Sequence, residues 1–488
     1  MKLREKICAV AAALVLCVTA VYAQNQDPNS QSGNPSAPIP PTSSPLGGGY
    51  AQQPAPAARG VSPAYTPQPG EPSQVTPDTN TLAGAQLFGV GSLARAHNVF
   101  DPSLFVSEYG ETYPPATGQS TNLLYATLVG GGLTFNRTWS RYHLTALYTG
   151  GENLYRGYYS LNQPYHDLSV MQEANWNRWH LLLRDDFTAS SGATFSGNGL
   201  GGPGSLAQLS STVGSSLNGT GLGVVPLNAI NTGNVMRYLN TVIGQTEYSV
   251  SRRSTFTFAG SYGLLHFQTA GYISSHMLNA QAGYDYQLDP ADSIGILGSY
   301  GKINYNGLTY TTTNYTAALA FGRKITGRLA FQVGGGPQRI HTMTNAGDFQ
   351  LWYAAVNSAL TYDWRRSGYS LAYQRGLSSG SGVFLGSMAN TLTGSAHYNF
   401  TRFWTGGLAG GYSMNTSLEP VGTPTVRFDY WFVGANIGRQ IGRHAQINFN
   451  YGLQRQYSPA VCPVVYCGVN GYQHTFGMSF NWHLRPTG

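Results

Sequence analysis

Apolar and polar residues alternate along most of the chain after about residue 98. In the stretch 445–454, Ala, Ile, Phe, Tyr and Leu occupy the odd positions, and Gln, Asn, Asn, Gly and Gln occupy the even ones. The stretches 278–288 and 255–262 show the same pattern. A period of two gives a β-strand one apolar and one polar face. The body of the chain is therefore predicted to be all-β and built from amphipathic strands.

Short polar turns separate these strands at regular distances. Successive turns lie about 38 residues apart, a spacing that fits two strands of about 11 residues, one tight turn and one longer loop. One interval is about twice as long and contains an insertion. We expect the turns near 136–140, 176–178, 251–254, 289–292, 323–327, 363–368, 401–404 and 439–442.

The alternation of short and long connections is typical of a transmembrane antiparallel up-and-down β-barrel. We expect about 18 strands, with 16 the next best count, a first strand near 98–110 and a last one at 472–484. The barrel must be closed, because backbone groups in hydrocarbon need partners. Two alternatives stay open: a soluble β-sandwich that buries the aromatic face, and a propeller with blades of about 40 residues. The propeller would call for Trp-Asp signatures, which the sequence lacks.

Composition supports a chain that faces both lipid and water. Only 10% of the residues are charged, against about a quarter in soluble domains, and the mean hydropathy of −0.20 is too low for a bundle of apolar helices. Most basic residues fall at the predicted turns, where we expect solvation or lipid headgroup contact rather than nucleic-acid binding. Six tryptophans at or beside those turns predict an interfacial aromatic girdle: Trp139, Trp176, Trp179, Trp364, Trp404 and Trp482.

The N-terminal region divides into three segments ahead of the barrel, which we place at residues 98–488. Residues 1–23 combine a basic start, an apolar run and the small-residue site Val21-Tyr22-Ala23, and so predict a cleaved signal peptide. Residues 24–80 hold 13 of the 26 prolines and few charges, which predicts a disordered periplasmic linker. Residues 81–97 form a short transition segment.

The exported chain keeps two cysteines close to its C-terminus. Cys462 and Cys467 are separated by four residues in a chain predicted to reach an oxidising compartment, so we expect a disulfide between them. A metal site would need further ligands at matching spacing, and only scattered histidines are available.

The C-terminal strand carries the most specific motif. Thr475, Gly477, Phe480 and Trp482 follow the order polar, any, Gly, two of any, aromatic, any, aromatic. This resembles the assembly signal of Gram-negative outer-membrane β-barrel proteins, the porin-like barrels among them. The resemblance implies a location in the cell outer membrane and recognition by the barrel-assembly machinery. The chain departs from the pattern because residues 484–488 follow the last aromatic residue, where such chains commonly end.

Candidate chemistry is sparse. An uncharged stretch, Phe187–Met236, is either a loop folded into the lumen or a mobile external loop. His166 and Asp167 are the one adjacent pair that suggests catalysis, and a pair is not a site; we expect no enzyme, no cofactor and no metal. Residues on the polar faces, together with charged residues within strands, are predicted to line the pore: Arg184, Asp186, Glu247, Gln281, Asp285, Arg375, Gln446, Asn448 and Asn450.

The function expected from this pattern is passive diffusion of small hydrophilic solutes through an outer-membrane channel, with weak ion selectivity. A structural or surface-interaction barrel, or an export conduit, is the alternative. The expected partners are outer-membrane lipid, the assembly machinery, the cell wall through residues 24–80 and further copies of the same chain, with no nucleic acid.

Overall fold

The computed structural model describes a β-rich body that begins at residue 98. The described residues are 98–113, 122–157, 162–191, 224–225, 235–269, 271–344, 347–379, 382, 385–418, 425–457 and 471–484. The predicted signal peptide, linker and transition segment lie outside them, as do Cys462 and Cys467. No helix in the described part of the chain is long and apolar enough to cross a membrane.

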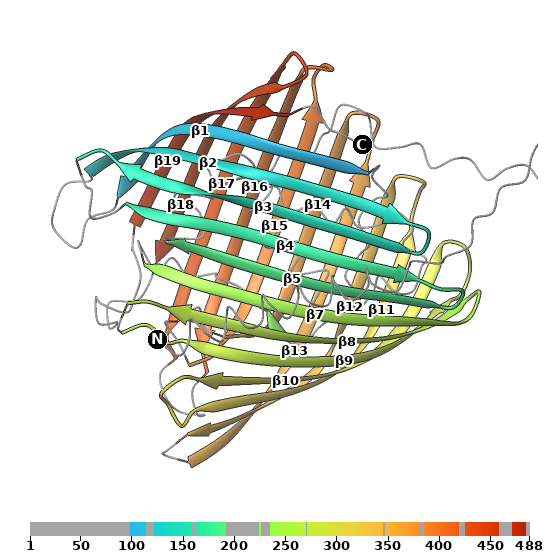
Figure 1. Cartoon of the computed structure of the whole chain (residues 1–488). Coiled ribbons are helices and arrows are strands. Elements are labelled where there is room, and N and C mark those ends of the chain that lie inside the picture. Colours follow the sequence, from blue (N-terminus) through green and yellow to red (C-terminus); the bar gives the residue numbers. More distant parts are fainter. Residues whose placement is uncertain are drawn as a thin grey trace, which may run out of the picture. The chain divides into compact units, whose positions relative to one another are not determined.

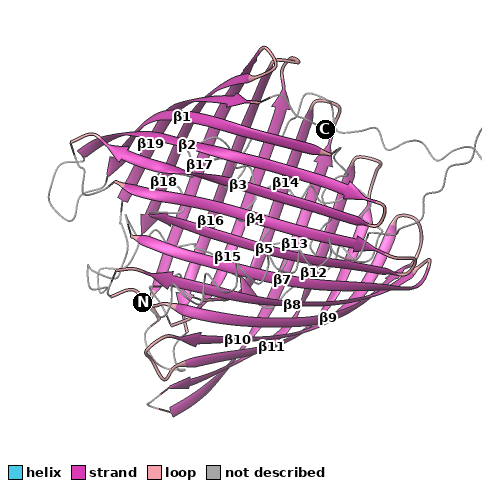
Figure 2. Ribbon diagram, in the orientation of Figure 1, coloured by secondary structure: helices cyan, strands magenta, loops and turns pink. Residues whose placement is uncertain are grey.

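The strands are long and follow one another in sequence order (Figures 1 and 2). Their bounds are β1 Val99–Tyr113, β2 Asn122–Trp139, β3 Tyr142–Tyr155, β4 Gln163–Asn175, β5 Trp179–Ser191, β6 Val224–Val225, β7 Met236–Ser251, β8 Ser254–Phe267, β9 Ser275–Gln287, β10 Asp292–Tyr305, β11 Thr311–Lys324, β12 Leu329–Thr344, β13 Gly347–Asp363, β14 Ser367–Ser378, β15 Ser387–Asn399, β16 Trp404–Ser417, β17 Arg427–Ile441, β18 Ala445–Tyr457 and β19 Gly471–His483.

The sheet closes on itself. Each long strand pairs antiparallel with its neighbour in sequence, and β1 pairs with β19 from Ser103 opposite His483 to Glu111 opposite Thr475. Of the 19 strands, only the two-residue β6 is not part of the wall, so the wall has 18 strands. The predicted barrel and its strand count are confirmed, and the sandwich and propeller alternatives are wrong.

The predicted turns lie together at one end of the barrel. The first ends up at 140–141 rather than 136–140, because β2 continues to Trp139, and the others agree to within a few residues. The wall begins and ends there too: Val99 pairs with Asn136 next to the first turn, and the His483 N–H donates to the His444 carbonyl over 2.7 Å. Short turns and both ends of the wall mark the periplasmic side of an outer-membrane barrel.

Alternation separates the two surfaces of the wall. On β10, Ile296 is 57% exposed on the outer face, whereas Ser293 is fully buried on the inner face. The same division runs through β8, β9, β11 and β18, where Phe, Tyr and Leu point outward. Five of the six girdle tryptophans are exposed at the short-turn end: Trp139, Trp176, Trp179, Trp364 and Trp482. A closed wall with an apolar outer band is the architecture of a porin-like barrel in the outer membrane.

A chain of buried side chains crosses the seam where the wall closes. Tyr155 on β3 donates its hydroxyl to Glu111 of β1 over 3.2 Å, and Gln473 of β19 donates to the other Glu111 oxygen over 3.4 Å. Gln454 of β18 in turn donates to Gln473 over 2.6 Å. The Glu111 carboxylate therefore links β1 to β3 and to β19, and Gln473 extends the link from β19 to β18. We name the set Tyr155, Glu111, Gln473 and Gln454 the seam network.

Removing the Glu111 carboxylate should weaken the closed barrel. Glu111→Ala removes one charged hydrogen-bond acceptor from the Tyr155 hydroxyl and one from the Gln473 amide, and each lost bond costs about 1–3 kcal/mol. We expect a lower urea midpoint for the refolded full chain, followed by tryptophan fluorescence. Glu152→Ala, which removes an exposed carboxylate from β3, is the control. Equal midpoints for the two variants would contradict a role in closure.

Candidate functional site: a polar lumen with a narrowed mouth

The inner wall carries most of the predicted pore-lining residues. Gln281 and Asp285 on β9, and Gln446, Asn448 and Asn450 on β18, alternate with outward aromatic and aliphatic side chains. Arg184 and Asp186 on β5 and Glu247 on β7 likewise alternate with outward residues such as Leu183 and Tyr248. These eight side chains belong to the inner face, and their role in conduction remains a prediction.

Arg375 differs from the other eight residues. It is opposite Val356 in the last pair of the β13–β14 ladder, on the same face of β14 as the outward Tyr369 and Leu371. Its position at the point where the two strands separate could not be read from charge alone.

The predicted charged residues form local pairs rather than one site. The Arg184 Nε atom is 2.7 Å from an Asp186 carboxylate oxygen, and Ser169 on β4 donates to Asp186 over 2.6 Å. Glu247 is 3.4 Å from His180 Nδ1 and also accepts a hydrogen bond from Gln245. The His166 and Asp167 side chains point to opposite sides of the wall, and His166 Nδ1 contacts the Tyr148 hydroxyl at 3.0 Å on the outer face.

Many inward polar side chains have atoms without a hydrogen-bond partner among the described residues. Buried examples in the described part of the chain, each with at least one such side-chain nitrogen or oxygen atom, include Ser103, Ser107, Thr145, Thr149, Thr257, Asn279, Asp285, Ser293, Ser299, Thr316, Asn450, Thr475 and Asn481. Each such atom costs about 1–3 kcal/mol if it stays dry. Soluble cores contain only a few unsatisfied groups per 100 residues. The inner wall is therefore chemically suited to contact with water.

An apolar cluster fills the inner face near the other, extracellular end. Met277 on β9, Ile303 on β10, Ile340 on β12 and Leu351 on β13 face inward and pack with Leu377 on β14. By alternation Leu377 belongs to the outer face of β14, together with Leu371. It is nevertheless fully buried within this inner cluster, as is Met388 of β15. The end of β14 and the start of β15 therefore turn inward. We call the described residues of this segment, Leu377, Ser378, Gly382 and 385–388, the inward hairpin end.

Backbone hydrogen bonds hold the inward hairpin end to the residues just before β9 and just after β16. The Ile273 N–H, next to β9, donates to the Gly382 carbonyl over 2.9 Å, and the Leu418 N–H donates to the Gly386 carbonyl over 3.3 Å. Both glycines have positive φ values, 79° and 91°, which other residues rarely adopt. A Cβ atom on Gly382 would also collide with the Phe267 ring of β8. This segment therefore occupies part of the lumen at the extracellular end, and we expect it to narrow the mouth.

Part of the long connection between β5 and β7 also reaches this region. Val224–Val225, the short strand β6, pairs in parallel with Leu377 and Ser378, just beyond the point where β14 loses β13 as a neighbour. Strand β14 is seven places from β7 in the order of the sheet. This part of the predicted loop is thus held against the far wall. The rest of residues 192–234 lies outside the described residues.

Sequence periodicity did not predict the inward hairpin end. The alternation along β14 continues through Leu377, so it assigns this residue to lipid. The available signal was the Gly- and Ser-rich run at 376–387, which suits a chain that bends sharply. The motif of β19 divides as strand geometry requires, with Thr475 and Gly477 inward and Phe480 and Trp482 outward.

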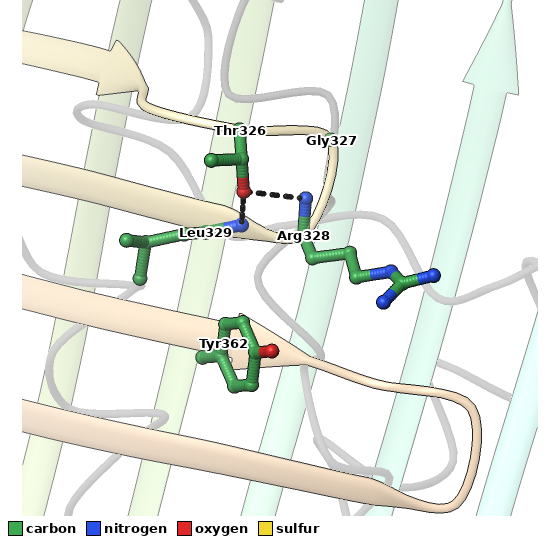
Figure 3. Close-up of a pocket in the computed structure, with 5 residues that line it drawn as sticks. All are labelled: Thr326, Gly327, Arg328, Leu329 and Tyr362. Atoms are coloured by element: carbon green, nitrogen blue, oxygen red, sulfur yellow. Dashed lines mark hydrogen bonds between the residues drawn. The ribbon is translucent and has the colours of Figure 1, made fainter.

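A shallow depression of about 470 Å³ lies at the short-turn rim, outside the lumen (Figure 3). The Thr326 hydroxyl accepts hydrogen bonds from the backbone N–H groups of Arg328 and Leu329, over 3.2 and 3.0 Å, and Tyr362 lines the other side. The Arg328 side chain extends away from the turn (Figure 3).

Comparisons with known proteins add little beyond the fold. No family model matches the sequence, and no match is found among curated proteins. Solved structures with some likeness include OpdQ of Pseudomonas aeruginosa, with 9% identity, a TM-score of 0.38 and coverage of 81% of this chain and 100% of that chain. OccK2 (OpdF) of the same organism has 10% identity and a TM-score of 0.38, covering 79% and 98%. OccAB3 of Acinetobacter baumannii has 9% identity and a TM-score of 0.40, covering 80% and 100%. These values are too low to carry over a solute or a residue role.

The inward hairpin end can be displaced by one substitution. Gly382→Val combines a strained positive φ with the collision against Phe267, so we expect the segment to leave the mouth and the single-channel conductance to rise. Gly327→Val is the control, because a Cβ atom there meets nothing within 4 Å. A folded Gly382→Val protein with unchanged conductance would show that this segment does not limit the pore.

Proposed function

We propose that the protein is an outer-membrane channel through which small hydrophilic solutes diffuse passively. The carrying observation is the set of inward polar side chains without protein partners. An interior sealed from water would leave all of them unsatisfied, a cost far above the stability of an ordinary domain. Water in a hydrated lumen supplies the missing hydrogen-bond partners. A barrel of 18 strands is also wide enough for an aqueous path.

The wall suits small solutes that form hydrogen bonds. Hydroxyl and amide groups dominate the inner faces of β18 and β19, so a solute can exchange its hydration shell for wall contacts as it moves. The apolar cluster at the extracellular mouth offers no such exchange and favours solutes small enough to pass with their water. Passive diffusion needs no bound cofactor and no turnover.

Current through planar bilayers tests the proposal. We expect the refolded full chain to give discrete conductance steps. In a Cys462→Ser, Cys467→Ser background, a bulky cationic thiol reagent should reduce the conductance of Gln446→Cys, because this position is on the inner face of β18. The matched control is Ile447→Cys, one residue along and on the outer face, where the reagent should have no effect.

Two results would count against the channel. Folded protein that gives no conductance steps would defeat the proposal itself. Steps that respond equally to the reagent at positions 446 and 447 would place the conducting path somewhere other than the lumen.

A further inference from the structure

A groove of about 670 Å³ lies in the outer, lipid-facing surface of strands β8 to β12. Its floor is made of small residues that are directly opposite one another on β9, β10 and β11: Ala282, Gly298 and Ala317. Larger outward side chains border this floor: Phe256, Phe258, Tyr284, Ile296, Leu319 and Pro337. A Cβ atom on Gly298 would meet nothing within 4 Å, so the floor opens directly to the surrounding lipid.

A row of aromatic and basic side chains lies just beyond the groove, toward the extracellular end. Four outward residues are opposite one another in succession on β10, β11, β12 and β13: Tyr300, Tyr315, Arg339 and Trp352. Arg339 follows Pro337 by two residues, which places it about 7 Å along the strand from the edge of the groove. Tyrosine and tryptophan are enriched where a membrane protein meets lipid headgroups. The row therefore marks the headgroup level of the outer leaflet.

The sequence of β12 agrees with this level. From Leu329 at the short turn to Pro337, the outward positions hold only Leu, Phe, Val, Gly and Pro. That stretch matches the roughly 9–11 residues with which a tilted strand crosses the hydrocarbon. Arg339 is the next outward residue, so its guanidinium is placed where the strand leaves the hydrocarbon on the extracellular side.

Two basic side chains at this level have no acidic partner among the described residues. Arg339 donates to the side-chain oxygen of Gln350 over 2.9 Å, and this partner is neutral. Lys302 points outward on β10, on the other side of β11. The ion pairs that Lys and Arg form within the described chain involve neither residue. Asp348, farther toward the loop on the same face of β13, is 3.6 Å from His341. An anion can therefore bind between Lys302 and Arg339.

We propose that this surface binds a lipid of the outer leaflet that carries a phosphorylated, anionic headgroup. The phosphate accepts hydrogen bonds from Arg339 and Lys302, and one acyl chain fills the groove over Gly298. Basic pockets on membrane proteins hold such headgroups, and a chain in the groove gains more van der Waals contacts than a chain on a flat wall. The parts follow the order of a lipid, with the charge at the headgroup level and the apolar groove toward the membrane centre. The site faces lipid and does not depend on the proposed channel function.

Native mass spectrometry of the refolded full chain in detergent tests the headgroup end of the site. We expect one dioleoyl phosphatidylglycerol to stay bound, and dioleoyl phosphatidylcholine, with the same acyl chains, to bind more weakly. Arg339→Gln should weaken phosphatidylglycerol binding about fivefold, the effect of removing one Arg beside an anionic headgroup. Arg455→Gln is the control, because it removes an outward Arg from β18, where the guanidinium donates to the Tyr472 hydroxyl over 2.8 Å.

The same measurement tests the groove when the groove is filled. Gly298→Leu places a side chain in open space within the groove, so the barrel should fold and phosphatidylglycerol should bind several-fold more weakly. Gly244→Leu is the matched control, because Gly244 is an outward glycine on β7 whose Cβ atom would also meet nothing within 4 Å, away from the groove. Gly298→Leu and Arg339→Gln change opposite ends of the site, so either variant decides if the other fails to fold.

Four results would overturn the site. Equal binding of the two lipids, or equal losses in Arg339→Gln and Arg455→Gln, would show that the headgroup charge is not recognised there. Equal binding in Gly298→Leu and Gly244→Leu would show that the groove holds no acyl chain. Displacement of the lipid by inorganic phosphate alone would indicate a site for a free anion. A dimer without bound lipid that is lost in Gly298→Leu would indicate a contact between two copies of the chain.

Discussion

Pairing between the first and last long strands is the constraint on which the structure depends. An open sheet would leave the backbone groups of β1 and β19 unpaired in hydrocarbon, where no water can replace the missing partner. The register from Ser103 to Glu111 against His483 to Thr475 removes both edges at once. Once the wall is closed, the pleat of each strand decides which side chains meet lipid and which meet the lumen. The seam network adds buried side-chain hydrogen bonds at this junction, beyond the backbone pairing of neighbouring strands.

The two ends of the lumen differ in their chemistry because different constraints act on them. At the short-turn end the long strands are joined in pairs by tight turns, so the wall remains regular. At the other end β14 loses β13 beyond Arg375, and the freed strand end turns inward onto an apolar cluster. The described lumen wall is therefore apolar near its extracellular end and polar near its periplasmic end.

Much of the fold could be predicted from the sequence because the two faces of each strand produce a strict alternation of apolar and polar residues. The alternation in 445–454 and 278–288 assigned Asn448 and Gln281 to the inner face, and the turn spacing predicted 18 strands and a first strand near residue 98. Those signals are local, because the face of each residue can be assigned from the residues two positions before and after it.

The inward hairpin end depends on contacts between β14 and strands β9–β13, which the local alternation of residues does not record. Leu377 follows the pattern of a lipid-facing residue and is buried inside. Arg375 was predicted to line the pore from its charge, although the alternation of β14 gives it the same parity as the outward Leu371, and its role stays a prediction. Asp285 was predicted to face inward, but only the structure reveals that its carboxylate has no hydrogen-bond partner among the described residues.

Exclusion of neutral polymers from the open channel tests this asymmetric, water-filled lumen most directly. Polyethylene glycols of graded size, added to one side of a planar bilayer at a time, report how far a solute of each size can enter. If the lumen is hydrated and narrowed at its extracellular mouth, the largest polymer that still lowers the conductance should be larger when added on the periplasmic side than when added on the extracellular side. Equal size limits from the two sides, or a limit reached first from the periplasmic side, would contradict the narrowed mouth.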